Sequence, residues 1–349
     1  MPDQILVPES VLREKVTAAL KGAGADDDSA AGCTRALLYA SRMGFDSHGV
    51  RLTAHYVAML RAGRINPRPN RRVRRTGPST AMIDADDGLG HAATYAAMDL
   101  ACGLARESGI GAVGVFRSSH FGAGGAYAVA GADSGYLALV TTNTDSVVAP
   151  HGGSRAFHGT NPLAVAAPVT GRRPWLLEMA TSSMPYNRVV LARAAGVPLP
   201  AGVAADGQGN PTVDPAEAQM LLPLGGIDFG YKGAGLAGLV TIFSAALTGG
   251  TLDPDMIPMF QTQNFHTPRN LGHFCLALDP ERFVGRAAYD RAMGRYLTRL
   301  RAVRPRPGER VLAPGDREWE TEANRARAGI PVDSTTAKFL SVDGAARCP

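Results

Sequence analysis

Apolar residues recur at helical spacing through the first part of the chain. Leu52, Tyr56, Met59 and Leu60 fall on one face of a 3.6-residue period, so residues 50–64 are expected to form a helix. Apolar positions earlier in residues 8–46 follow the same period. A polar turn that ends in glycine, residues 47–49, interrupts the pattern, because glycine disfavours a helix interior. The first 64 residues are therefore expected to be helical, with one break.

Residues 80–180 show a different pattern, in which short apolar runs alternate with glycine-rich loops. A proline- and arginine-rich connector at residues 67–78 separates this region from the N-terminal helices. Residues 92–108 predict a helix. Strands are predicted at residues 81–84, 110–115, 136–142, 163–166 and 175–179.

The chain is loop-rich between residues 196 and 233. Helical periodicity returns at residues 233–246, where small apolar side chains allow close packing on a sheet, and again at residues 280–303 and 317–328. With 349 residues, 45% of them hydrophobic, the chain can bury a large core and divide into two or three subdomains.

The cysteines and the N-terminal residues indicate the compartment. Cys33, Cys102, Cys275 and Cys348 are widely scattered and form no CxxC pair, so no disulfide framework or metal-binding pattern is expected. No basic segment followed by an apolar one opens the chain, and no run of about 18 apolar residues occurs. A cytoplasmic protein with no membrane segment is expected.

The net charge of +5 raises the possibility of nucleic-acid binding, since basic residues cluster at residues 68–75 and 295–310. The cations are nearly all arginine, a bias typical of base composition, and aromatic residues make up only 6% of the chain. None lies within the first cluster to stack on bases. Nucleic acid is therefore an improbable partner, and attraction of a small anionic substrate is the better use of the charge.

A dinucleotide-binding motif is suggested by Gly88-Leu89-Gly90-His91-Ala92-Ala93, which matches GxGxxA between a predicted strand and a predicted helix. The alternation of strands and helices that a Rossmann fold requires does not continue after residue 115. These glycines are therefore interpreted as turn residues.

His48 is the first candidate for proton transfer, because Asp46 and Ser47 can orient its ring and Gly49 leaves room for a ligand. Arg51, three positions further on, supplies a cation that matches a substrate carboxylate. An isolated histidine is more often a helix-end residue bonded to the backbone, and that alternative stays open.

His120 is the second candidate, in a loop of small residues, Ser118 to Gly125, that a ligand can approach closely. The two histidines can share the proton work, or one can bind while the other transfers, and the residues alone leave both arrangements open. A histidine that only caps the loop is the structural alternative.

Three further groups of residues are candidates for binding. Asn143 ends a predicted strand, and Gly159-Thr160-Asn161-Pro162 is a turn sequence; both are equally compatible with a purely structural role. Lys232 precedes the helix expected at residue 233, where a lysine and a helix N-terminus can bind a pyrophosphate together. No HExxH, clustered His/Cys or GxSxG pattern occurs, so neither a metal site nor a serine hydrolase is expected.

These motifs, taken in order, resemble the malate/L-lactate dehydrogenase family of NAD(P)-dependent 2-oxo acid reductases. The resemblance spans residues 8–340. It is carried by Ser47-His48-Gly49-Val50 with Tyr56 and Gly63-Arg64-Ile65, Ser119-His120-Phe121-Gly122, Thr142-Asn143 with Ala149-Pro150, Gly159-Thr160-Asn161-Pro162, Ala180-Thr181-Ser182, Lys232-Gly233 and Pro314-Gly315.

The resemblance implies an α/β fold whose dinucleotide-binding domain is not a Rossmann domain and has a largely antiparallel sheet. Residues 76–279 would form that domain, and residues 1–75 and 280–349 would form a helical domain from both chain ends. The protein would be a homodimer that uses NAD or NADP.

The resemblance also implies site residues. His48 would be the catalytic proton donor, with His120 as a second catalytic residue that also contacts the cofactor. The substrate would be bound by Ser47, Arg51, Tyr56, Asn143 and Thr160. The dinucleotide would be bound by Gly159, Thr160, Asn161, Glu178, Met179, Ala180, Thr181, Ser182, Arg188, Tyr231, Lys232, Pro314, Gly315 and Asp316.

The chain departs from the family pattern near the expected cofactor site. Glu178 replaces the usual aspartate, Asn187-Arg188 the usual Gly-Lys, Ala234 a tyrosine and Thr241 an acid. Arg188 keeps a cation, which favours an oxo acid over a cyclic imine. The departures leave open the substrate, the choice between NAD and NADP, and the retention of activity. Reduction of a cyclic imine carboxylate and a catalytically silent, nucleic-acid-binding protein are the alternatives.

Overall fold

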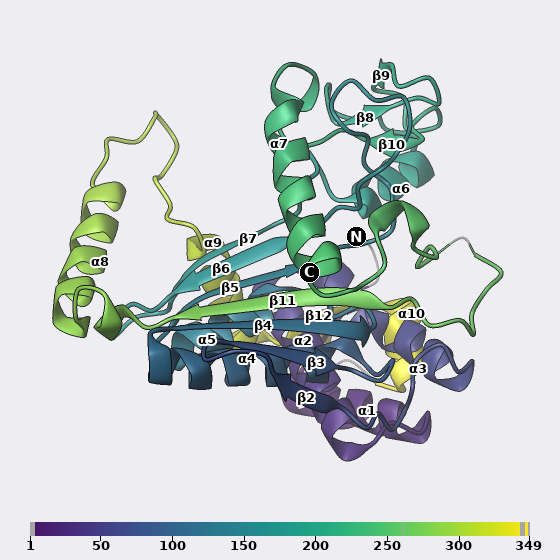
Figure 1. Ribbon diagram of the computed structural model, residues 1–349. Coiled ribbons are helices and arrows are strands. Elements are labelled where there is room, and N and C mark those ends of the chain that lie inside the picture. The colour runs from purple at the N-terminus through teal and green to yellow at the C-terminus, as the bar shows by residue number, and fades with distance from the viewer. Residues whose placement is uncertain (1–3, 261, 343–345, 348–349) are drawn as a thin grey trace.

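The computed structural model describes residues 4–260, 262–342 and 346–347, and a seven-stranded sheet runs through its centre (Figure 1). Of the neighbouring pairs in this sheet, β3 and β4 are parallel and the others are antiparallel. This confirms the expected α/β class and the largely antiparallel sheet. In spatial order the strands are β2 (Arg72–Arg75), β3 (Thr80–Asp84), β4 (Ile110–Ser118), β11 (Leu271–Leu278), β5 (Leu137–Thr142), β6 (Leu163–Ala167) and β7 (Trp175–Met179).

Strand β11 occupies the middle of the sheet, between β4 and β5, although it comes from far along the chain. Cys275 pairs with Val113 on one side and Val140 on the other, and all three side chains are fully buried. The sequence prediction missed this strand. Because both of its faces are covered, it reads as a continuous apolar run without the alternation that identifies a half-exposed strand.

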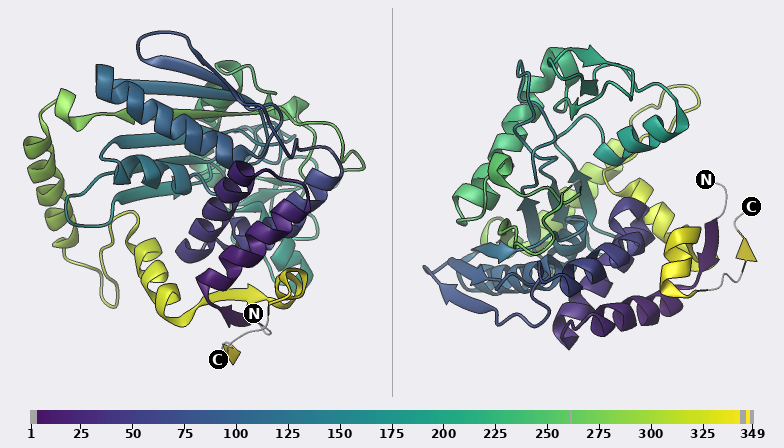
Figure 2. Two further views of the ribbon diagram at one scale, coloured as in Figure 1. Left: turned by 90° about the horizontal axis from the view of Figure 1, so that it is seen from below. Right: turned by 90° about the vertical axis from the view of Figure 1, so that its right-hand side faces the viewer.

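Helices cover both faces of the sheet (Figures 1 and 2). On one face lie α4 (Gly90–Ser108) and α5 (Gly125–Asp133), and on the other lies α7 (Gly226–Thr241), which continues into a π-helical turn, η3 (Ile242–Ala246). Glycines permit the close approach on the first face. A Cβ on Gly131 would lie only 2.7 Å from the Ala138 Cβ of β5 and the Met98 sulfur of α4.

The two ends of the chain share one apolar core below the sheet (Figure 2). Leu12 and Leu37 from the first helices are buried there together with Ile330 and Leu340. Strand β1 (Gln4–Val7) pairs with β12 (Ile330–Asp333) and β13 (Ala346–Arg347). The helices of this part are α1 (Glu9–Gly22), α2 (Asp27–Met43), α3 (Thr53–Arg61), α9 (Asp316–Ala328) and α10 (Ser334–Leu340). The proposed domain boundaries remain a prediction.

The remaining elements lie away from this core. Helix α8 (Arg286–Arg301), which follows the short turn η5 (Pro280–Arg282), stands apart from the N-terminal helices in Figure 1. Above the sheet, α6 (Tyr186–Ala195) packs beside a small sheet of β8 (Ala204–Ala205), β9 (Pro211–Thr212) and β10 (Met220–Leu221). Within the described part of the chain, no helix combines the length and apolarity needed to cross a membrane.

Several predicted elements need correction. Helix α7 begins at Gly226, not at residue 233, so Lys232 lies within the helix and not at its N-terminus. Strand β2 lies in the segment interpreted as a connector, and α5 follows directly on the glycine-rich loop that carries His120. The helix predicted at residues 50–64 starts with a short 3₁₀ turn, η2 (Val50–Leu52), and α3 itself begins at Thr53. The arginines of β2 and the glycines in and before α5 concealed these two elements in the sequence.

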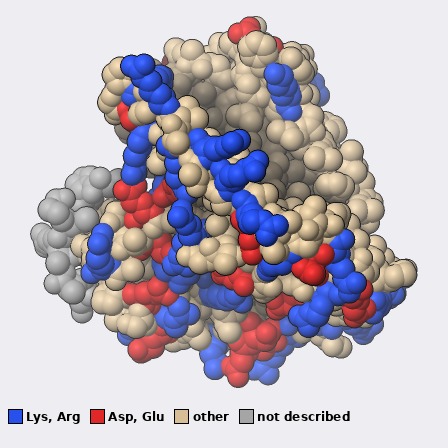
Figure 3. All heavy atoms as spheres, turned by 90° about the vertical axis from the view of Figure 1, so that its left-hand side faces the viewer, with Lys and Arg blue, Asp and Glu red and all other residues tan. Residues whose placement is uncertain are grey.

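Some arginines of the basic clusters form ion pairs within the molecule. Arg71 pairs with Asp28, and Arg75 pairs with Glu107. Figure 3, which shows the side of the molecule where α8 lies, has acidic side chains between the basic ones. No continuous basic surface of the kind that follows a nucleic-acid backbone is visible on this face.

Candidate active site

His48 lies in a 3₁₀ turn, η1 (Asp46–His48), just after α2 ends in the left-handed conformation at Gly44. The turn is held against α2, because the Val50 amide donates to the Ser41 hydroxyl at 3.0 Å. A Cβ on Gly49 would lie 2.2 Å from that hydroxyl, so only glycine fits. The Asp46 carboxylate pairs with Arg325 of α9 at 2.9 Å and does not orient His48 as predicted from the sequence.

The rings of His48 and His120 stack on each other, with centroids 5.8 Å apart and planes inclined by 29°. The Ser47 hydroxyl lies 2.9 Å from His48 Nδ1 and orients this ring. Burial lowers the pKa of His48 below its ordinary value, because the charged imidazolium loses solvation. The structure thus brings together the two histidines that the sequence places 72 positions apart.

Tyr56 is fully buried, and its hydroxyl lies 2.6 Å from His120 Nδ1. Burial raises the pKa of Tyr56 well above its usual value, so the phenol keeps its proton and donates it to the histidine. The Gly122 amide also points at Nδ1, at 3.4 Å. With Nδ1 accepting, the proton of neutral His120 resides on Nε2.

Burial and the neighbouring charges of His48, His91, His55 and Arg269 place the pKa of His120 well below 6.5. His120 is therefore neutral at physiological pH. A neutral imidazole can still donate a hydrogen bond from Nε2 to a carbonyl oxygen. Such a bond can polarise the carbonyl group of a substrate.

Two fully buried histidines that sequence reasoning missed support the His120 loop. His273 of β11 lies 2.9 Å from the Ser118 hydroxyl and 2.8 Å from that of Thr142, and it stacks on Phe121. The ring of His91 meets Tyr56 edge-on. Burial lowers the pKa of each histidine to about 3, so both are neutral supports. The motif Gly272-His273-Phe274 within an apolar run was the available signal.

The glycines of the GxGxxA match also serve this loop. The Gly90 amide donates to the Ser119 hydroxyl at 3.0 Å, and a Cβ on Gly90 would lie 2.1 Å from the Ser119 carbonyl oxygen. The match therefore places the start of α4 against the residue before His120. Gly88 lies in a turn, which its amide closes on the Ala85 carbonyl at 2.9 Å, whereas Gly90 is the first residue of α4 and not a turn residue as predicted.

The structure does not bring Arg51 into the cluster formed by Ser47, His48, Tyr56 and His120. Its side chain is exposed on η2, and its charge acts on Asp333, at the start of α10. Among the described residues, the buried guanidinium groups are those of Arg64 and Arg269. The charge of Arg269 reaches His120, His55 and Tyr56.

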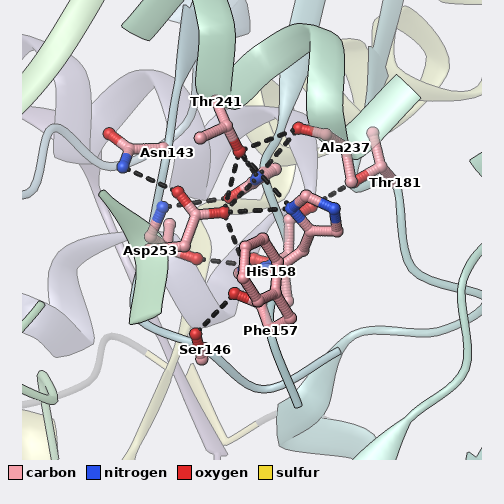
Figure 4. A network of polar contacts seen from close by, with 12 residues as sticks. Asn143, Ser146, Phe157, His158, Thr181, Ala237, Thr241 and Asp253 are labelled. Atoms are coloured by element: carbon pink, nitrogen blue, oxygen red, sulfur yellow. Dashed lines mark hydrogen bonds and ion pairs between the residues drawn. The ribbon is translucent and has the colours of Figure 1, made fainter. Parts of the chain in front are cut away.

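Asn143, Gly159 and Asn161 converge on a buried carboxylate, Asp253, which sequence reasoning missed (Figure 4). The amide nitrogens of Asn143 and Asn161 donate to it at 2.8 and 2.7 Å, and the Thr241 hydroxyl donates at 2.9 Å. Burial opposes the charge of Asp253, but these bonds and those from His158 and Gly159 hold its pKa below the usual value. The network anchors the ends of β5 and α7 to the loop before β6.

This network limits what its members can bind. The Asn143 nitrogen also donates to the Thr251 carbonyl at 2.8 Å, and only Oδ1 of this side chain lacks a partner among the described residues. Asn161, with a φ of +38°, donates further to the Ala237 carbonyl. A Cβ on Gly159 would overlap Thr144. All three therefore have a structural role here, whatever they contact in addition.

The next predicted binding residues follow β7. The Thr181 amide and hydroxyl both donate to the Thr160 carbonyl, at 2.9 and 3.1 Å. The Thr181 carbonyl accepts from the Leu224 amide, and Ser182 pairs with Pro223, just before α7. Met179 and Ala180 precede them and are half-buried. Residues 159–161 and 178–182 are thus adjacent in space, as the resemblance implies.

Glu178 lines a cleft of about 320 Å³ together with Pro314 and Gly315. Burial raises the pKa of its carboxyl group to about 7, and its Oε2 has no hydrogen-bond partner among the described side chains. A Cβ on Gly125 would lie 2.1 Å from this oxygen. The backbone amides of Gly125 and Gly124 face the carboxyl group and oppose the effect of burial on its pKa. A carboxyl group beside this cleft fits the ribose hydroxyls of a dinucleotide. Asp316 pairs instead with Arg301, at 2.6 Å.

Arg188, Tyr231 and Lys232 lie apart from that cleft. Arg188 is exposed on α6, Tyr231 is 53% exposed, and Lys232 lies over the Phe229 ring with its Nζ at 5.3 Å from the centroid. No hydrogen bond or ion pair of the described residues joins them to Glu178. No group of three or more potential ligands in residues 4–260, 262–342 and 346–347 has the geometry of a metal site.

Comparison with known proteins gives one consistent match. The family described as malate/L-lactate dehydrogenase matches residues 7–341. Malate dehydrogenase of Pyrococcus horikoshii is 35% identical over 335 residues, covering 94% of this chain and 91% of the relative. The solved structure of the Pyrococcus horikoshii enzyme aligns with a TM-score of 0.87 at 32% identity, covering 99% and 98% of the two chains.

Other relatives differ in the names of their substrates and cofactors. The (2R)-3-sulfolactate dehydrogenase (NADP(+)) of Chromohalobacter salexigens is 37% identical and covers 78% of this chain and 81% of its own. The ureidoglycolate dehydrogenase (NAD(+)) of Escherichia coli is 29% identical, at 97% and 95% coverage. A delta1-piperideine-2-carboxylate reductase structure from Pseudomonas syringae has a TM-score of 0.86 at 27% identity, covering 96% and 98%.

Proposed function

Since this chain belongs to the malate/L-lactate dehydrogenase family, we propose that it interconverts a small 2-oxo acid and its 2-hydroxy acid, with His48 as proton donor. The family shows that the protein is an NAD(P)-dependent oxidoreductase. The observation that carries the choice of proton donor is the stacked pair of His48 and His120, with Tyr56 behind it.

The two histidines divide the work on the substrate carbonyl. Nicotinamide, when bound, supplies the hydride to the carbonyl carbon. His120 is neutral and donates a hydrogen bond to the carbonyl oxygen from Nε2. His48, oriented by the Ser47 hydroxyl at Nδ1, delivers the proton that converts the oxygen to a hydroxyl group. An anionic substrate beside it raises the pKa of His48 and so favours the protonated form.

The cofactor assignment rests on the cleft at Glu178. There, Glu178 would hold ribose hydroxyls, residues 159–161 and 179–182 would line the dinucleotide, and Pro314 and Gly315 would close the cleft. Arg188, Tyr231 and Lys232 would reach it only from exposed positions. The proposal covers NAD and NADP alike, since relatives carry either name.

Reduction of a cyclic imine carboxylate is the second candidate, and it is favoured by the likeness to the piperideine-carboxylate reductase structure. The same hydride would reach a C=N carbon beside a carboxylate.

The proposal also includes a homodimer in a reducing cytoplasm. Exposed apolar residues on α7 and η3, such as Ile227 and Ile242, supply a surface that a second copy can cover, and Cys33, Cys102 and Cys275 are buried free thiols.

The test is oxidation of NADH and NADPH, followed by nicotinamide absorbance, against a panel of 2-oxo acids and cyclic imine carboxylates. We expect turnover of 2-oxo acids and a fall in kcat of about 100-fold or more for His48→Asn. His266→Asn removes an exposed histidine and serves as the control. A His48→Asn enzyme within a few-fold of wild type would show that another group donates the proton.

A further inference from the structure

Four non-glycine residues with a left-handed backbone conformation meet at the end of β4, and contacts join them. Asp86 and Asp87, in the turn after β3, have φ values of +51° and +57°, and Arg117 of β4 and Asn270, just before β11, both have +48°. A side chain in this conformation crowds its own backbone, so most residues avoid it. Such strain persists where surrounding contacts impose it, and it is frequent beside functional sites.

The guanidinium group of Arg117 contacts three carboxylates at once. Its Nη1 donates to both oxygens of Asp84 at 3.1 and 3.0 Å, and its Nη2 donates to Asp86 at 3.1 Å and to Asp87 at 3.0 Å. An isolated ion pair on a surface contributes little, but several charges on one planar fork form a network of defined geometry. The side chain therefore ties β4 to the turn after β3.

The backbone of Arg117 is held from two sides. Its amide donates to the side-chain oxygen of Asn270 at 2.7 Å, and its carbonyl accepts from the Asp87 amide at 2.7 Å. Asn270 is itself anchored, because its side-chain nitrogen donates to the Gly249 carbonyl at 3.2 Å. The left-handed conformation of Arg117 is thus imposed by both of its neighbours in space and by its own side chain.

The strand β4 contains a β-bulge at this point. Val115 and Ser118, three residues apart, pair with His273 and Leu271, which are only two apart. One extra residue of β4 is therefore accommodated, and Arg117 lies within the irregular segment. A bulge bends its strand and changes the direction of the side chains that follow it. The residues that follow here are Ser118, Ser119 and His120.

The turn that binds Arg117 also binds the N-terminal part of the chain. The Asn66 side-chain nitrogen donates to the Asp86 carbonyl at 3.1 Å and to its carboxylate at 3.0 Å, and the Asn70 amide donates to the same carboxylate at 3.0 Å. Asn66 lies shortly after α3, the helix that carries Tyr56. The contacts of Asp86 therefore connect the helical unit that supplies Tyr56 to the strand that leads to His120.

We propose that Arg117 is a positioning residue for His120. The carboxylate cluster of Asp84, Asp86 and Asp87 holds Arg117 in the left-handed bulge, and the bulge directs His120 towards the Tyr56 hydroxyl. This inference rests on the proposed function, in which His120 donates a hydrogen bond to the substrate carbonyl. A donor that loses its alignment stabilises the transition state less, so the effect appears in kcat and not in KM.

The first experiment compares Arg117→Ala with Arg117→Asn, using a 2-oxo acid that wild type reduces. Both remove the guanidinium group, but asparagine tolerates the left-handed conformation and alanine does not. Arg117→Ala is expected to lower kcat by about 10-fold with KM within about 3-fold, and Arg117→Asn to recover at least about half of that loss on a logarithmic scale. Arg74→Ala, exposed on β2, is the control and should leave kcat unchanged. Equal losses in the two Arg117 variants, or Arg117→Ala within about 2-fold of wild type, would overturn the proposal.

The second experiment separates positioning from a general loss of stability. In a Tyr56→Phe background, Arg117→Ala should lower kcat by no more than about 3-fold further, because the bond through which it acts is already absent. Losses that multiply in the double variant would show that Arg117 does not act through Tyr56 and His120.

Ring nitrogen chemical shifts of His120 supply a measurement that needs no turnover. They should move in Arg117→Ala towards the values of Tyr56→Phe and stay at the wild-type values in Arg74→Ala. Unchanged shifts in Arg117→Ala would overturn the positioning role. Failure of wild type to reduce any 2-oxo acid or cyclic imine carboxylate would contradict the proposed function, and the shifts would still test the role of Arg117.

Discussion

The Tyr56 hydroxyl and His120 Nδ1 are 2.6 Å apart, and this bond fixes the tautomer of the histidine. Tyr56 has no exposed surface, so its proton has no competing acceptor in solvent. The bond joins α3 to the loop after β4, which places a helix of the N-terminal unit against the central sheet. One hydrogen bond thus couples the packing of two parts of the chain to the protonation of a candidate catalytic residue.

Replacing Tyr56 with phenylalanine keeps the ring against His91 and removes only the donor. We expect kcat for 2-oxo acid reduction to fall by about 10-fold with little change in KM, because His120 then populates both tautomers and only one donates towards the substrate. Nitrogen chemical shifts of the ring should show the Nε2–H form in wild type and a mixture in the variant. Tyr296→Phe, on α8, is the exposed control. Unchanged shifts in Tyr56→Phe would contradict the tautomer assignment.

The pH dependence of the reaction follows from His48. Its pKa in the free protein lies below 6.5, so the protonated form needed for reduction increases as pH falls through that range. We expect kcat/KM for reduction to rise towards low pH with an inflection below 6.5, and kcat/KM for oxidation of the hydroxy acid to show the opposite slope. The slopes should disappear in His48→Asn. A profile for reduction that rises with pH would exclude His48 as the acid.

The sequence was informative where function depends on local motifs. Ser47-His48-Gly49 and Ser119-His120 were identified because each combines a histidine with small polar neighbours, and the structure brings them together. Glu178 and Pro314-Gly315 also meet in one cleft. The fold was predicted from the family resemblance and not from periodicity, because a largely antiparallel sheet with one parallel pair leaves no simple periodic signature.

The sequence was uninformative where a role depends on distant neighbours. Arg51 and Arg64 are indistinguishable in the chain, and only the fold shows that the first is exposed and the second buried. Asp253 lies in a proline-flanked turn that resembles any surface turn, yet it is fully buried. Such residues are recognised by burial and partners, which are properties of packing and not of spacing.

Asp253 is predicted to be a major contributor to stability. Asp253→Ala removes one of the acceptors of the Asn143 and Asn161 side-chain amides and the acceptor of the Gly159 backbone amide, so we expect a loss of roughly 2–4 kcal/mol in urea unfolding. Because the pKa of Asp253 is lowered in the folded state, this contribution is present above the unfolded value near 3.8 and is lost as pH falls through the folded value. Asp255→Ala, two residues away and exposed, should cost little. Equal effects of the two substitutions would contradict the network.

The raised pKa of Glu178 predicts that stability depends on pH in the direction opposite to the contribution of Asp253. Its carboxyl group ionises near 4.5 in the unfolded chain and at about 7 in the folded protein. Between these values the folded protein holds a proton that the unfolded chain has lost, so the free energy of unfolding falls as pH rises towards 7. Glu178→Gln stays neutral and keeps a similar shape. We therefore expect its stability relative to wild type to increase between pH 4.5 and 8 by on the order of 3 kcal/mol.

Urea unfolding of wild type and Glu178→Gln across that range measures the difference directly, since other titrating groups cancel between the two proteins. Glu217→Gln, an exposed control, should give a constant difference. The charge of Glu318 is the second cause that raises the pKa of Glu178, so Glu318→Gln should shift the midpoint of the Glu178 effect to lower pH. A difference between wild type and Glu178→Gln that does not vary with pH would show that the carboxylate is solvated and already ionised in the folded protein.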